Sequence, residues 1–112
     1  PIAAIPPPKC QHCDGVLRPG VVWFGEELPN HVWRHAEQLV VECDALMVVG
    51  TSGVVYPAAR LPIMARECGK WVGEINPNES DLSDKVNLHW QTTAARGLPS
   101  LLEALQKRTP TN

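Results

Sequence analysis

The sequence predicts an α/β fold in which short parallel strands alternate with helices. Three apolar segments have the length and composition of strands: Ala45–Val49, Trp71–Ile75 and residues 86–90. Helical periodicity precedes the first segment and separates the first from the second, and a leucine-bearing helical segment follows the third. This order is typical of a parallel sheet with right-handed crossovers and helices on its faces.

Composition limits the size of the fold and the class of partner. At 112 residues the chain fits one small domain. The net charge is −2 and no basic cluster is present, which argues against a nucleic-acid partner. The longest purely apolar run, Ala45–Val49, is far too short to span a bilayer, so no membrane segment is expected.

A proline-rich lead, residues 1–9, is expected to be extended and to run into a cysteine turn. Cys10 and Cys13 have the C-x2-C spacing that supplies two ligands to a structural zinc ion. A closed zinc site takes four ligands and no second pair follows, so residues 1–15 are expected to hold half a zinc knuckle. This half motif lies close to a first residue that is proline, so we expect the chain to be part of a longer protein.

The other two cysteines, Cys43 and Cys68, stand alone in apolar periodic segments and are expected to be small buried side chains. Two disulfides in a secreted miniprotein are the alternative use of four cysteines. A C-x2-C pair with two core cysteines favours an intracellular protein, in the cytoplasm or a mitochondrion.

The first half of the chain contains three predicted elements. Residues 17–24 are expected to form a strand interrupted by Pro19 and Gly20, and Gly25 ends it. A helix is expected from Asn30, the predicted N-cap, to about residue 43. The strand Ala45–Val49 follows and ends in a loop of small residues, 50–53.

The second half continues the alternation. A helix is expected at residues 61–68, with a proline in its first turn and Gly69 after its end. Strand Trp71–Ile75, a polar loop at 78–85 and a strand at 86–90 follow, and Gly97 precedes the last helix. Residues 16–107 therefore predict part of a doubly wound, Rossmann-like nucleotide-binding sheet, with a frayed tail at 108–112. The Gly-rich pyrophosphate turn of such sheets is absent from the sequence.

Several short motifs occur in the order found in one family. They are the Cys10/Cys13 pair, the block at residues 17–26, the loop at 50–52, the segment at 55–59, the Ile75-Asn76 pair and the Leu98-Pro99 pair. With these motifs the chain resembles the C-terminal half of sirtuins, the NAD-dependent protein lysine deacylases. The block at 17–26 is most similar to the bacterial and mitochondrial branch, which includes deacetylases and desuccinylases.

The resemblance implies a groove for an acyl-lysine peptide. The Val22 backbone would hold the acyl-lysine amide, and Phe24 would lie close to the acyl group. Gly25 and Glu26 would pair with the peptide main chain as an added strand, and Tyr56 would complete the clamp. An ordinary strand end followed by a turn is the alternative interpretation of these residues.

The resemblance also implies NAD contacts at the ends of the strands. Gly50, Thr51 and Ser52 would touch the ribose–phosphate portion, and Asn76 the adenosine ribose; loops at this edge of parallel sheets commonly bind ligands. Ala94 would lie beside the adenine, although the glycine of the family's turn is missing there. A strand-to-helix turn at 50–52 and an Asn-Pro turn at Asn76 are the alternatives.

No catalytic residue is expected in this chain. Sirtuins use a histidine base in a His-Gly context, and none of His12, His31, His35 and His89 is in that context. The chain is therefore expected to be a fragment of an NAD-dependent deacylase and to be inactive alone. Its expected cofactors are NAD and zinc, the latter at a half site that can be unoccupied. Its expected partners are an acyl-lysine peptide and either the missing N-terminal half or a second copy at an exposed sheet edge. A stand-alone interaction module and a metal-binding knuckle protein without NAD chemistry are the alternatives.

Overall fold

The computed structural model describes residues 5–108. The predicted proline-rich lead and tail extend beyond these limits, so residues 1–4 and 109–112 lie outside the described part. The elements are α1 (Asn30–Glu42), β1 (Ala45–Val49), α2 (Arg60–Glu67), β2 (Trp71–Ile75), β3 (Leu88–Trp90) and α3 (Ala94–Arg108). Within the described residues no helix is long and apolar enough to cross a bilayer.

The three strands form one parallel sheet, as the sequence predicts, and their order in it is β1-β2-β3. Ala45 pairs with Trp71 at the start of the first ladder, and Gly73 pairs with Leu88 at the start of the second. Because β2 lies between the other two strands, the outer edges of β1 and β3 have no strand partner within residues 5–108.

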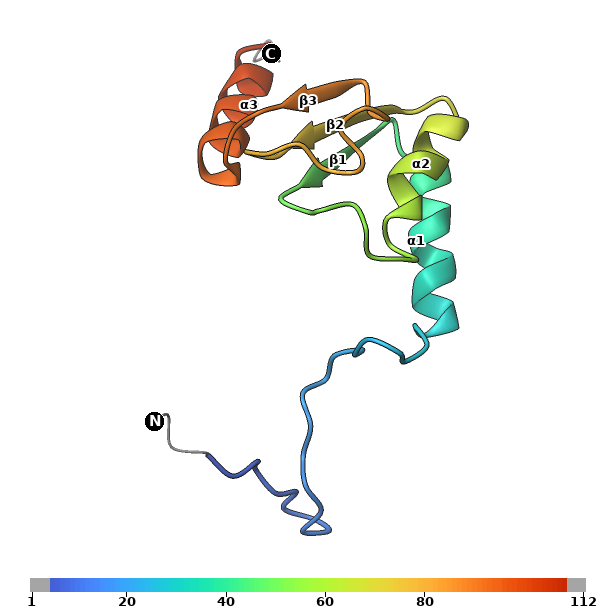
Figure 1. The fold of residues 1–112 in the computed structure, drawn as a ribbon, viewed down its shortest axis with the longest axis vertical. Helices are drawn as coiled ribbons and strands as arrows, with labels where there is room; N and C mark the ends of the chain where they lie inside the picture. The colour runs from blue at the N-terminus through green and yellow to red at the C-terminus, as the bar shows by residue number, and fades with distance from the viewer. Residues whose placement is uncertain (1–4, 109–112) are drawn as a thin grey trace.

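Helices lie on both sides of the sheet (Figure 1). On one side α2 packs against β1, β2 and α1. The core on this side is built from Val40, Val48, Ala65, Val72 and Leu82, all buried. On the other side α3 contributes only one buried residue, Gly97, so much of this sheet face stays open.

Most predicted elements are confirmed, with shifted ends. Strands β1 and β2 have their predicted bounds, whereas β3 begins at Leu88, two residues later than expected. Helix α3 begins at Ala94, before the predicted glycine, because the Thr93 carbonyl accepts hydrogen bonds from Arg96 and Gly97. Pro99 is tolerated inside this helix, which reaches Arg108, the first residue of the predicted tail.

The strand predicted at residues 17–24 is wrong. Residues 17–24 form no strand: the isolated antiparallel bridge nearby joins Lys9 and Val16, and the side chains of residues 17–24 are exposed. Figure 1 shows this part of the chain running away from the sheet. A strand needs a neighbouring strand for its backbone groups. The Leu17 N–H donates to the Pro8 carbonyl, but no strand of the described residues pairs with this segment. The expected burial of the lone cysteines is also wrong, since Cys43 is half-buried and Cys68 is exposed.

The fold exposes more surface than a compact domain does. Its solvent-accessible area is 9032 Å², against roughly 6,100 Å² for a compact protein of 12.3 kDa. Much of the excess is apolar, including Trp71 and Trp90 on the sheet and Leu102 and Leu105 on α3. Apolar area of this extent is typical of a surface that meets another protein segment.

Candidate functional site

Two loops at the carboxyl ends of neighbouring strands form a polar cavity of about 370 Å³. One loop follows β1 and the other follows β2. The lining residues are Gly50, Thr51, Ser52, Val54, Asn76, Asn78, Glu79, Ser80 and Asp81. The structure therefore brings together four of the five predicted cofactor residues; the fifth, Ala94, begins α3 and does not line this cavity.

Backbone hydrogen bonds and one side chain fix the loop after β1. The Gly50 N–H donates to the Ile75 carbonyl over 3.0 Å, and Gly50 has a φ of 62°, a left-handed conformation that suits glycine. The Asn76 side-chain amide donates to the Thr51 carbonyl over 2.8 Å. Asn76 thus joins the two loops that form the cavity.

Asn76 is itself held on several sides. It is 9% exposed, and its side-chain oxygen accepts from the Asn78 N–H over 3.3 Å. Its backbone N–H donates to the Trp90 carbonyl, and its own carbonyl lies 3.0 Å from His89 Nε2. An amide oxygen has two lone pairs, so Asn76 retains an acceptor position for a ligand hydroxyl.

All five predicted substrate-binding residues line a second cavity, of about 520 Å³. Val22, Phe24, Gly25 and Glu26 come from the segment before α1, whereas Tyr56 comes from the loop before α2. Phe24 is 91% exposed and Tyr56 is 67% exposed. Two exposed aromatic rings beside free backbone are suited to binding an extended peptide with an apolar side chain.

Arg18 holds this segment in its turn, a role that the sequence analysis missed. Its guanidinium donates to both Glu26 carboxylate oxygens, over 2.7 and 3.0 Å, and to the Val21 carbonyl. It also lies 4.0 Å from the centre of the Trp23 ring. The Arg18 guanidinium, and then the Trp23 N–H, lower the pKa of the Glu26 carboxyl, which stays ionised. The turn therefore replaces the predicted strand.

The cysteine pair lies on a hairpin with the form of a knuckle. The Cys10 N–H donates to the Gly15 carbonyl over 2.8 Å, and the Asp14 N–H donates to the Cys10 carbonyl over 3.0 Å. The N–H groups of His12 and Cys13, and then the Cys13 side chain, lower the pKa of the Cys10 thiol. A lowered pKa favours the thiolate that binds metal.

The donor set is that of half a zinc site. Within residues 5–108 no three or more His, Cys, Asp or Glu side chains are placed to hold one metal ion. A tetrahedral structural site needs four ligands, and Cys10 and Cys13 supply two. The residues present therefore fit zinc only together with ligands from elsewhere.

None of the four histidines lines either cavity. His12, His31 and His35 are exposed, and His89 is half-buried against the Asn76 carbonyl.

Comparison with known sequences gives the family. The Sir2 family profile matches residues 2–57, half of the chain. The NAD-dependent protein deacylase of Corynebacterium glutamicum is 49% identical over 105 residues, which are 94% of this chain and 41% of that protein. The NAD-dependent protein deacylase of Aquifex aeolicus is 47% identical over 102 residues, 91% of this chain and 43% of that protein. The chain thus spans about two fifths of the length of these relatives.

Solved structures agree with the sequence relatives. A Sir2 homologue in complex with NAD superposes with a TM-score of 0.85 at 41% identity, over 91% of this chain and 40% of that chain. A Sir2 protein bound to an acetylated peptide superposes with a TM-score of 0.79 at 31% identity, over 88% and 42% of the two chains. The parallel sheet with flanking helices is therefore part of a Rossmann-like fold, and the chain belongs to the Sir2 family.

Proposed function

We propose that this chain is part of an NAD-dependent protein lysine deacylase, to which it contributes part of the NAD cradle and one wall of the acyl-peptide groove. The reaction of that whole protein transfers the acyl group of a lysine to the ADP-ribose portion of NAD and releases nicotinamide. The observation that carries the proposal is the pair of cavities: one is lined by all five residues assigned to the acyl-peptide, and the other by four of the five assigned to NAD.

The polar cavity is suited to the ribose and phosphate groups of NAD. Its exposed small residues Gly50, Thr51 and Ser52 offer backbone and hydroxyl groups at close approach, and Asn76 offers its amide oxygen. Named relatives are NAD-dependent deacylases, and a structural neighbour was solved with NAD. Ala94 is a weaker candidate for the adenine side, because it lies outside this cavity.

The second cavity is suited to an acyl-lysine. A peptide strand would lie along Gly25 and Glu26, and its acyl-lysine would approach Val22 and Phe24 with Tyr56 on the facing loop. Structural neighbours were solved with acetylated and propionylated peptides. We propose that the general base of the whole protein comes from outside residues 5–108 and that the chain is inactive alone; the absence of a histidine from the lining of both cavities supports this. A cytoplasmic or mitochondrial location stays a prediction.

Titration of the 112-residue chain with NAD, followed by amide NMR, tests this proposal. Shift changes confined to residues 50–52 and Asn76 are expected, and a Ser52→Ala variant is expected to weaken them. Ser100→Ala, which changes an exposed serine on α3, serves as the matched control and leaves them unchanged. No nicotinamide is expected from NAD and an acetylated peptide. Nicotinamide release would contradict the inactivity, and absent or scattered shifts would contradict the NAD cradle.

The zinc proposal concerns Cys10 and Cys13, which provide two of four ligands. The monomeric chain is expected to lose zinc to a chelator, because two thiolates cannot close a tetrahedral site. A dimer that retains one zinc per two chains would show that two copies complete the site. Retention of one zinc per monomer, or by a Cys10→Ser/Cys13→Ser variant, would contradict the half-site.

The free edge of β1 and the open sheet face would then be covered by the rest of the deacylase. A stand-alone interaction module is the second candidate, because the same exposed apolar area and unpaired edge could bind a partner instead. NAD shifts confined to the cradle favour the deacylase, whereas a self-associating chain without such shifts favours the interaction module.

A further inference from the structure

Glu74 is a buried carboxylate in the central strand of the sheet. It is 1% exposed and lies on β2, between β1 and β3. Within residues 5–108 no lysine, arginine or histidine forms an ion pair with it. An acidic side chain buried without a cation is disfavoured unless hydrogen bonds compensate for its lost hydration.

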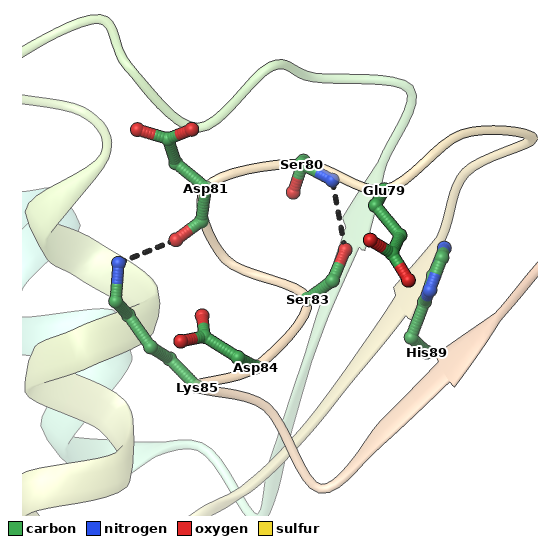
Figure 2. Close-up of a pocket in the computed structure, with 7 residues that line it drawn as sticks. All are labelled: Glu79, Ser80, Asp81, Ser83, Asp84, Lys85 and His89. Carbon is green, nitrogen blue, oxygen red and sulfur yellow. Dashed lines mark hydrogen bonds between the residues drawn. The ribbon is translucent and has the colours of Figure 1, made fainter.

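Hydroxyl groups from the following loop provide that compensation. The Ser80 hydroxyl donates to Glu74 Oε1 over 2.5 Å, and the Ser83 hydroxyl donates to Oε2 over 2.6 Å. The Asn76 amide lies 3.4 Å from Oε1. Figure 2 shows Ser80 and Ser83 on the same turn of the chain, where the Ser80 N–H donates to Ser83 Oγ over 2.9 Å.

This anchored loop in turn holds the loop after β1. The Asp81 N–H donates to the Ser52 carbonyl over 3.1 Å, which links the two walls of the polar cavity. Leu82, whose N–H donates to Ser80 Oγ, packs against Gly53. Hydrogen bonds thus connect Glu74 to the polar cavity by two routes. One passes through Ser80 and Ser83 to the loop at 78–85, and the other passes through Asn76.

We propose that Glu74 is a positioning residue for the polar cavity: its buried carboxylate fixes the loop at 78–85, and that loop and Asn76 fix residues 50–52. Naming NAD as the ligand whose affinity depends on Glu74 rests on the proposed function. The inference that one loop holds the other in place does not rest on the proposed function. A purely structural role would instead spread the effect of its loss over the whole sheet.

The substitution Glu74→Gln tests this role while conserving shape. An amide offers one acceptor oxygen where the carboxylate offers two, and charge-assisted hydrogen bonds are about twice as strong as neutral ones. Amide hydrogen exchange at Asp81 and Leu82 is expected to become about tenfold faster. The Asn87 N–H, which donates to the Val72 carbonyl at the opposite end of the sheet, serves as the internal reference and is expected to change less.

Two further variants keep the test decisive. Asp84→Asn changes an exposed carboxylate on the same loop that does not line the polar cavity; it is the matched control and is expected to leave exchange unchanged. Ser83→Ala removes one donor and keeps the carboxylate, so it replaces Glu74→Gln as the test if that variant does not fold. Equal acceleration at Asn87, Asp81 and Leu82, or none in either variant, would overturn the positioning role.

A parallel NAD titration separates this inference from the proposed function. NAD shifts at residues 50–52 are expected to require about tenfold more NAD in Glu74→Gln than in the unchanged chain. If the unchanged chain shows no such shifts, the proposed NAD cradle fails, and the exchange rates alone decide the role of Glu74. If the shifts occur with equal affinity in both proteins, Glu74 does not position the cradle.

Discussion

The substitution Ile75→Ala is expected to lower the free energy of unfolding by about 2–5 kcal/mol, the usual cost of truncating a buried isoleucine. Ile75 is fully buried at the end of β2. Gly97 of α3 packs so closely against it that a Cβ on Gly97 would lie 3.0 Å from Ile75 Cγ2. The change therefore leaves a cavity at the place where α3 meets the sheet.

Urea denaturation, followed by tryptophan fluorescence, measures this effect. Leu102→Ala is the control, since Leu102 lies on α3, the helix that contains Gly97, and is 57% exposed. We expect its free energy of unfolding to change by no more than about 0.5 kcal/mol. Typical domains have a net stability of only about 5–15 kcal/mol, so the Ile75 variant would be close to unfolding. Equal midpoints for the two variants would show that α3 is not anchored through Ile75.

The substitution Gly53→Ala is expected to cost about 2–4 kcal/mol, as the sum of backbone strain and overpacking. Gly53 has a φ of 74°, a left-handed conformation that alanine disfavours. Its added Cβ would lie 2.7 Å from Leu82 Cγ and 3.3 Å from the Leu82 backbone nitrogen. Because Leu82 is buried in the core, it has little room to move away.

Gly69→Ala is a matched control for this prediction. Gly69 also has a φ of 74°, but nothing lies within 4 Å of the position of an added Cβ. Its substitution is expected to cost only about 1–2 kcal/mol, from the backbone alone. Thermal unfolding of both variants isolates the contact with Leu82, and equal losses of stability would contradict the close packing of the two cavity loops. The Gly53 variant is also expected to weaken NAD shifts at residues 50–52.

Local sequence patterns were sufficient to predict the helices and most strands, but not whether a segment would have a neighbouring strand. Strands β1 and β2 were predicted with correct ends, because short, largely apolar segments with glycine or proline close by are typical of strands. The segment at 17–24 has the same β-branched and aromatic composition, yet Arg18 and Glu26 tie it into an exposed turn. Composition measures the tendency to form a strand, whereas forming one requires a neighbouring backbone.

The same division holds for the candidate site. The meeting of the loop at 50–52 and Asn76 at one edge of the sheet could be predicted, because residues directly after neighbouring parallel strands lie at that edge; their NAD contacts stay a prediction. Glu74 could not, since an acidic residue in an apolar strand gives no indication of its partners. Ser80 and Ser83 reach it only because the loop at 78–85 folds back over the sheet.

The sequence alone predicted the alternation of strands and helices, the parallel sheet that this order implies, and the family. The strands, the helices and each motif depend on residues close together in the chain, and the order of these elements along the chain implies the parallel sheet. The tertiary structure decided that Tyr56 and Phe24 line one cavity, that Asp81 bonds to Ser52 across another, and that the Glu74 side chain lies buried in the central strand. Such contacts join residues far apart in sequence, and only the packing of the whole chain sets their distances.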